Sequence, residues 1–98
     1  MKKRKIPKSL QGVLWSVDVS HLDIERDKGY ITHQIFAYGN LPEFLWLLQT
    51  YGIEKIRQVF TDIPYKDYRA ARFHFIKNIL LNLKDRSMDE RYYVKNIP

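Results

Sequence analysis

The stretch AYGNLPEFLWLLQTYG (residues 37–52) contains a complete set of helix boundary signals. Asn40 is a good side-chain acceptor for the first turn, and Glu43 follows it at the spacing of a capping box. Tyr-Gly ends the run at Gly52 and also precedes it at Gly39. A glycine just past a helix adopts the left-handed conformation without a Cβ clash. A phosphate-binding loop would instead need several glycines followed by Lys-Ser or Lys-Thr, so both glycines are predicted to be helix stops.

Helical periodicity extends to both sides of this stretch. A capping box formed by Ser20 and Asp23 predicts a helix over residues 23–38, and a short helix is predicted over residues 53–60. The longest periodic segment predicts a final helix over residues 65–83.

Buried faces follow from the same spacing. In the helix after Asn40 the residues expected to face the core are Leu41, Leu45, Leu48 and Tyr51; in the final helix they are Tyr65, Tyr68, Phe75, Ile76, Ile79 and Leu83. Short extended pieces are predicted on residues 13–17 and 92–94. The predicted fold class is mostly α, a compact bundle of four to five helices with short extended pieces near the N- and C-termini.

The length of 98 residues and the apolar content of 45% allow one domain with a modest core. The net charge of +6 is uneven, because residues 2–8 hold five cations and no acid, while the middle of the chain is mildly acidic. A basic N-terminal tail (residues 1–8) and a single helical domain (residues 9–98) are predicted. Cysteine is absent and no apolar run reaches the length of a membrane span, so a cytoplasmic protein with no membrane partner is expected.

Groups that perform catalysis are not evident in the sequence. His21, His33 and His74 lack the short spacing that a metal site needs. The serines lie in no nucleophile-elbow or triad pattern. The chain is therefore expected not to be an enzyme and to need no cofactor or metal.

Basic side chains suggest a nucleic-acid interface as one alternative. Cations interleaved with aromatic residues can meet phosphates and stacked bases. The candidate residues are Lys2, Lys3, Arg4 and Lys5 in the tail and Lys66, Arg69, Lys77 and Lys84 along the final helix. A solvated helix face and a solubilising tail are the alternative interpretation of the same residues.

Four residues are candidates for contact with a protein partner. Trp46 lies on a helix that is apolar nearly all round, so it is either core or an anchor for another chain. Arg72 projects from an apolar sector, where it either extends its guanidinium to water or pairs with a carboxylate of another helix or chain. Tyr92 and Tyr93 form an aromatic pair in the final segment.

Residues 14–60 resemble a small bacterial family of about a hundred residues. The resemblance is carried by Trp15, Asp18, Tyr38-Gly39, Asn40, Trp46, Tyr51-Gly52 and Glu54 to Arg57. Members of that family are encoded beside nucleotidyltransferase toxins of the abortive-infection kind, so the resemblance implies an antitoxin. The chain departs from the family at Pro64-Tyr-Lys-Asp67, where a Ser/Thr-Pro-Lys-Thr-like helix start is usual.

Together these features predict a non-enzymatic protein-binding module. It would be antitoxin-like and would neutralise a partner, a toxin encoded nearby, by surface contact. The alternative is a nucleic-acid-binding protein or transcriptional autoregulator that uses the basic tail and the C-terminal helix. Self-association into a homo-oligomer is also left open by the sequence.

Overall fold

The computed structural model describes residues 6–95 and confirms the mostly α fold class. Its α-helices are α1 (Lys28–Tyr38), α2 (Leu41–Tyr51), α3 (Ile53–Asp62) and α4 (Ala70–His74), and α4 continues directly into a π-helical turn, η3 (Phe75–Leu80). Three short 3-10 helices complete the described part of the chain: η1 (Lys8–Gly12), η2 (Val19–His21) and η4 (Glu90–Tyr92).

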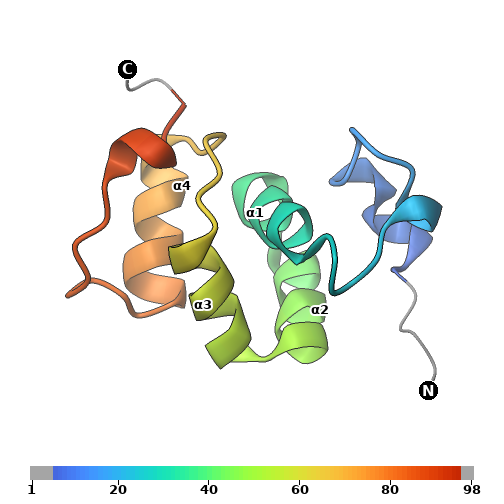
Figure 1. Cartoon of the computed structure of the whole chain (residues 1–98), viewed down its shortest axis with the longest axis horizontal. Coiled ribbons are helices and arrows are strands. Elements are labelled where there is room, and N and C mark those ends of the chain that lie inside the picture. Colours follow the sequence, from blue (N-terminus) through green and yellow to red (C-terminus); the bar gives the residue numbers. More distant parts are fainter. Residues whose placement is uncertain (1–5, 96–98) are drawn as a thin grey trace.

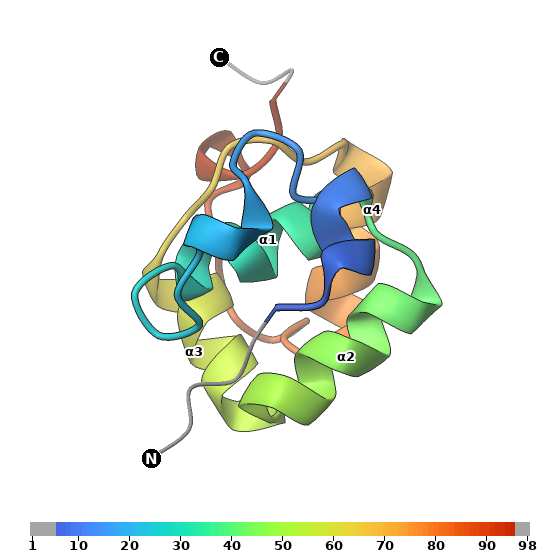
Figure 2. The ribbon, with the colours of Figure 1, turned by 90° about the vertical axis from the view of Figure 1, so that its right-hand side faces the viewer.

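Helix α1 is the centre of the bundle. It contacts α2, α3 and α4, and the six consecutive residues 31–36 are all buried. The N-terminal segment lies on the other side of α1 and α2 from α4 (Figures 1 and 2). A helix enclosed on every side loses the one-sided apolar pattern of a surface helix. This explains why α1 buries the polar residues Thr32, His33 and Gln34.

Local signals place α2 and its ends correctly. The Glu43 carboxylate accepts the backbone N–H of Asn40 at 2.6 Å, which closes the predicted capping box. Gly52 has φ +84° and ψ 153°, a conformation that is essentially limited to glycine. Gly39 is different, because its φ of −83° and ψ of 177° are extended. The prediction of a left-handed Gly39 was therefore wrong. Glycine is required there because a Cβ would lie 2.6 Å from the carbonyl oxygen of Ile35.

Helix α1 begins five residues later than predicted. The Asp23 carboxylate accepts the backbone N–H groups of Glu25 and Arg26 at 2.9 and 2.8 Å and thus caps an isolated turn ahead of the helix. Ser20 lies in η2, where its own N–H is capped by Asp18. The two residues of the predicted capping box therefore belong to two separate turns.

The final helix begins at Ala70 and not at residue 65, because a non-local pairing holds the preceding segment extended. The backbone N–H of Tyr68 donates to the carbonyl of Tyr93 at 2.8 Å, and the N–H of Lys95 donates to the carbonyl of Tyr68 at 3.0 Å. This is an isolated parallel bridge between Tyr68 and Val94. It accounts for part of the predicted C-terminal extended piece, although Tyr92 lies in η4.

The π-helical turn rotates the buried face of the last helix. The N–H of Leu81 donates to the carbonyl of Ile76, five residues back, at 2.9 Å. Each extra residue in a turn shifts the side chains that follow. Ile76 is buried as predicted, but Phe75 and Ile79 are exposed, and Leu81 is buried in their place.

The predicted extended piece at residues 13–17 is absent, because these residues form turns and bends. The Gln11 side chain holds them in place. Its Nε2 donates to the carbonyls of Leu14 and Val17 at 2.8 and 2.9 Å, and its Oε1 accepts the N–H of Val19 at 3.0 Å. Leu14 is consequently fully buried, and the alternation expected of a strand is lost.

Candidate functional site

Helix α2 turns only part of the predicted face to the core, where Leu48 and Tyr51 are half-buried and pack against the core cluster. Phe44 and Leu47 are buried, whereas Leu41 and Leu45 are exposed. Trp46 is half-buried and packs against the core cluster. The structure thus places Trp46 at the border between the core and the surface.

Arg72 is half-buried and binds the end of the central helix. Its Nη1 donates to the carbonyls of Phe36 and Gly39 at 3.0 and 2.8 Å, where α1 leaves acceptors without helical partners. Its guanidinium also lies over the ring of Phe44, 5.8 Å from the centroid. The interaction is therefore with backbone carbonyls and an aromatic ring, and not with the carboxylate that the sequence allowed. It fixes α4 beside the junction of α1 and α2.

The two C-terminal tyrosines have separate environments. Tyr93 is buried, and its hydroxyl donates to the carbonyl of Phe60 at 2.6 Å. Burial raises the pKa of Tyr93 to about 12, so the donor stays protonated at neutral pH. Tyr92 is exposed and remains accessible to a partner. The structure therefore does not bring the two rings to one surface.

The predicted basic residues do not form one continuous row. Lys66, Arg69 and Lys84 are exposed, and Lys77 is half-buried with its Nζ donating to Asn78 Oδ1 at 3.2 Å. Lys66 and Arg69 precede α4, while Lys84 follows η3, so they flank the helix at its two ends. The tail residues Lys2, Lys3, Arg4 and Lys5 lie outside the described residues.

Exposed apolar side chains occur one turn apart at two places on the helices, and we call these two sets the apolar pairs. Leu41 and Leu45 are one turn apart on α2, and Phe75 and Ile79 are one turn apart on η3. Leu41 and Ile79 are the most exposed, at 65% and 70%. Arg72 lies on α4, which continues into η3, and contacts the Phe44 ring of α2, so this side chain links the two helical segments that carry the pairs.

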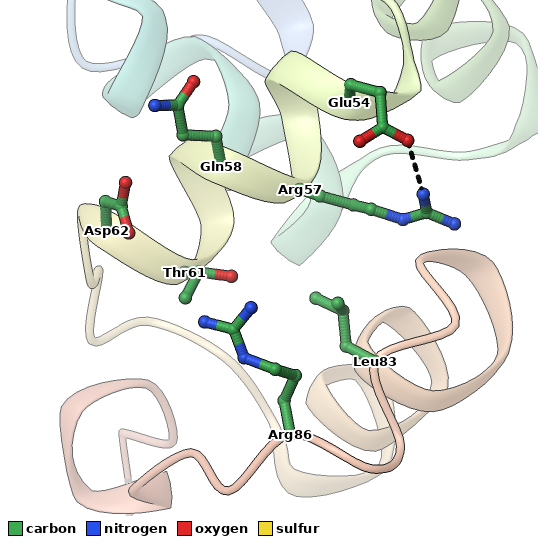
Figure 3. A pocket seen from close by; sticks show the side chains of 7 residues that line it. All are labelled: Glu54, Arg57, Gln58, Thr61, Asp62, Leu83 and Arg86. Atoms are coloured by element: carbon green, nitrogen blue, oxygen red, sulfur yellow. Dashed lines mark hydrogen bonds and ion pairs between the residues drawn. The ribbon is translucent and has the colours of Figure 1, made fainter.

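A shallow depression opens between α3 and the C-terminal segment (Figure 3). It is lined by Glu54, Arg57, Gln58, Thr61, Asp62, Leu83 and Arg86. Arg57 is already bound, since its Nη1 donates to Glu54 at 2.7 Å and its Nε donates to the carbonyl of Leu81 at 2.9 Å. These bonds join α3 to the end of the π-helical turn, which is a structural role.

A polar contact lies at the centre of the core, around His33. The ring Nε2 lies at hydrogen-bond distance from the carbonyl of Ile63, so this nitrogen carries the proton. The Nδ1 is therefore the acceptor, and the Tyr68 hydroxyl donates to it at 2.6 Å. Burial lowers the pKa of His33 to about 4, which keeps the imidazole neutral at pH 7.

The described residues offer neither a metal cluster nor a membrane span. Within residues 6–95, no group of three or more His, Asp or Glu side chains is placed to hold a metal ion. No helix in this range has the length and apolar character needed to cross a bilayer.

Comparison with protein families gives one match. The model of the family described as "Family of unknown function (DUF6922)" matches residues 10–60, which is half of the chain. The chain belongs to this family. The matched range runs from η1 through α1 and α2 to α3, so it contains the central helix and both Tyr-Gly pairs. Neither the curated proteins nor the solved structures contain a match.

Sequence reasoning missed the apolar pairs as surface residues. Leu41, Leu45, Phe75 and Ile79 were all assigned to the core from helical spacing. Spacing identifies a common face but does not tell which face meets the rest of the bundle. In α2 the sequence does contain a signal for exposed apolar residues. The helix has more apolar residues than one buried face of a short helix can use.

Proposed function

We propose that the protein is a non-enzymatic protein-binding module. The observation that carries this proposal is the pair of exposed apolar surfaces on α2 and η3. Isolated exposed leucines are common on soluble proteins, but large apolar side chains repeated one turn apart on two helices are typical of a contact surface.

The contact would be formed by side chains that are already held in place. Helix α2 is capped at Asn40 and stopped at Gly52, and Arg72 ties α4 to the start of α2. Leu41 and Leu45 therefore project from a rigid element. Rigid anchors lose little conformational entropy on binding, which favours affinity.

The antitoxin role rests on the sequence resemblance alone. In that role the protein would neutralise a toxin encoded beside it by covering the toxin's surface. The partner surface would be apolar with a mixed polar rim, because Asn40 and Glu43 border Leu41 on the same helix. The other candidate partner for the apolar pairs is a second copy of this chain, and the test must distinguish it from the toxin.

Co-expression with the product of the adjacent gene, followed by pull-down and a growth assay, tests this function. The double variant Leu41→Gln/Leu45→Gln should abolish the complex and the growth rescue while the melting temperature stays close to that of the parent. Val17→Gln is the matched control, since Val17 is an exposed apolar residue of the N-terminal segment.

Three results would count against the proposal. The first is a parent that forms no complex and gives no rescue, and the second is a double variant that binds as well as the parent. Equal loss of binding in Val17→Gln would show that the effect is general and not located on α2. Light scattering of the parent and the double variant reports whether the apolar pairs instead mediate self-association.

Nucleic-acid binding through the basic tail and the C-terminal helix is the second candidate. It is favoured by the exposure of Lys66, Arg69 and Lys84. Binding of this kind weakens steeply with salt, because cations release counterions from phosphates. A titration against generic duplex at several salt concentrations tests it, and affinity that does not change with salt would exclude it.

A further inference from the structure

Three segments that are distant in the sequence meet at the end of α1. They are the N-terminal loop with Trp15, the connection before α4 with Asp67 and Arg69, and the C-terminal segment with Lys95. All three lie at the upper end of the molecule in both ribbon views (Figures 1 and 2). Tyr38, the last residue of α1, lies between them.

The contacts within this group are specific. The Trp15 and Tyr38 rings meet edge to face, with centroids 4.5 Å apart and planes at 69°. The ammonium of Lys95 lies over the Tyr38 ring, 5.6 Å from the centroid, and 3.4 Å from its hydroxyl. Burial, followed by the nearby Asp67 carboxylate, raises the pKa of Tyr38 to about 12, and the positive charge of Arg69 opposes this shift, so Asp67 and Arg69 both lie near Tyr38. We call these five residues the Trp15 site.

The segments that carry Trp15 and Lys95 are each held by backbone hydrogen bonds. Gln11 fixes the loop around Trp15 by three hydrogen bonds to its backbone. The bridge to Tyr68 fixes the backbone of Lys95. The site is therefore preformed, and yet the indole of Trp15 remains 54% exposed.

An exposed indole packed on a tyrosine that Lys95 and Arg69 also approach combines the two features that bind an unpaired nucleotide. Every nucleobase has a π face that stacks on an aromatic ring, and ammonium and guanidinium groups bind the adjacent phosphates. Asp67 does not cancel this attraction by itself, since its single negative charge is outnumbered by Arg69 and Lys95.

We propose that the Trp15 site binds single-stranded nucleic acid, with one base stacked on Trp15 and the neighbouring phosphates contacted by Lys95 and Arg69. A duplex would be bound poorly there, because its bases are already stacked on one another. The proposal does not depend on the protein-binding function. It shares a ligand class and Arg69 with the second candidate, but it centres the binding on Trp15 and Lys95.

Fluorescence anisotropy of the full chain with a 5′-labelled oligouridine tests the proposal. The parent should bind the single strand more tightly than a hairpin duplex. Trp15→Ala should weaken binding about tenfold, and Trp15→Phe should retain most of the affinity because a ring remains. Lys95→Ala should lower the slope of log affinity against log salt by about one, the loss of one phosphate contact. Uridine monophosphate as competitor shows whether a free nucleotide suffices.

Arg86→Ala is the control, because it removes one positive charge at an exposed position after η3. It should leave the affinity near that of the parent. The proposal is overturned if the parent does not bind at low salt, or if Trp15→Ala binds as the parent does. Equal losses in Arg86→Ala and Lys95→Ala would also overturn it, since the binding would then be diffuse. If Trp15→Ala does not fold, the proposal is tested by Trp15→Phe and Lys95→Ala. The backbone N–H of residue 95 keeps its pairing with Tyr68 in the Lys95→Ala variant.

Discussion

Mild acid should destabilise this protein through His33. In the folded chain the imidazole is buried and neutral, and its Nδ1 is occupied by the Tyr68 hydroxyl. Protonation requires a second donor at a position where a hydroxyl already donates. Burial therefore lowers the pKa of His33 from its ordinary value of 6.5 to about 4. The unfolded chain, with a normal histidine, takes up the proton first.

The sign and the size of the effect follow from linkage. Because the folded pKa is the lower one, stability is complete above about pH 6.5 and is lost as the pH falls toward 4. Between pH 7 and pH 5 the free energy of unfolding should decrease by about 2 kcal/mol. For a small domain this is a large part of the total stability.

The titratable groups around His33 and the carboxylates with shifted pKa values do not mask the loss of stability between about pH 6.5 and pH 4. The phenols of Tyr65, Tyr68 and Tyr93 pack around the imidazole and stay neutral throughout. The carboxylates with lowered pKa values, Asp18, Glu25, Asp27 and Asp89, lose their contributions only below about pH 4.5.

Urea denaturation at pH 7 and pH 5, followed by circular dichroism, measures the decrease. His33→Gln should be less stable than the parent at pH 7. Its free energy of unfolding should change much less between pH 7 and pH 5 than that of the parent. His74→Asn is the control, because His74 pairs with Glu90 at the surface, away from the core. It should keep the dependence of the parent. A His33→Gln variant as sensitive to pH as the parent would refute the assignment to His33.

Other substitutions test the helix boundaries and the core. Gly52→Ala should cost about 1–3 kcal/mol through backbone strain at positive φ. Gly39→Ala should cost at least about 1 kcal/mol because its Cβ meets a carbonyl oxygen; thermal melts equal to the parent for either glycine would contradict its stated role. Arg72→Met keeps the aliphatic stem and removes two charged hydrogen bonds, so a loss of about 1.5–3 kcal/mol is expected in urea denaturation. Trp46→Ala should cost about 2 kcal/mol, less than a fully buried tryptophan; an unchanged melting temperature would assign Trp46 to an interface.

What sequence reasoning predicted correctly depends on local interactions. The ends of α2 are set by Asn40, Glu43 and Gly52, all within one helix and its caps, and the predicted boundaries agree with the structure. The fold class follows in the same way from helical periodicity. The need for glycine at position 39 was also recognised, although the reason is a steric contact with Ile35 and not a left-handed backbone.

Tertiary packing decided the features that carry the candidate sites. The sequence by itself determined which segments are helical, because caps and periodicity act over a few residues. It did not determine that α1 is enclosed, or that α2 turns Leu45 outward, since both depend on where neighbouring helices pack. The start of α4 is set by Tyr68 pairing with a segment far along the chain, and the same pairing carries Lys95 to Tyr38 and Trp15. Contacts of this length leave no local pattern, so only the folded chain brings these side chains together.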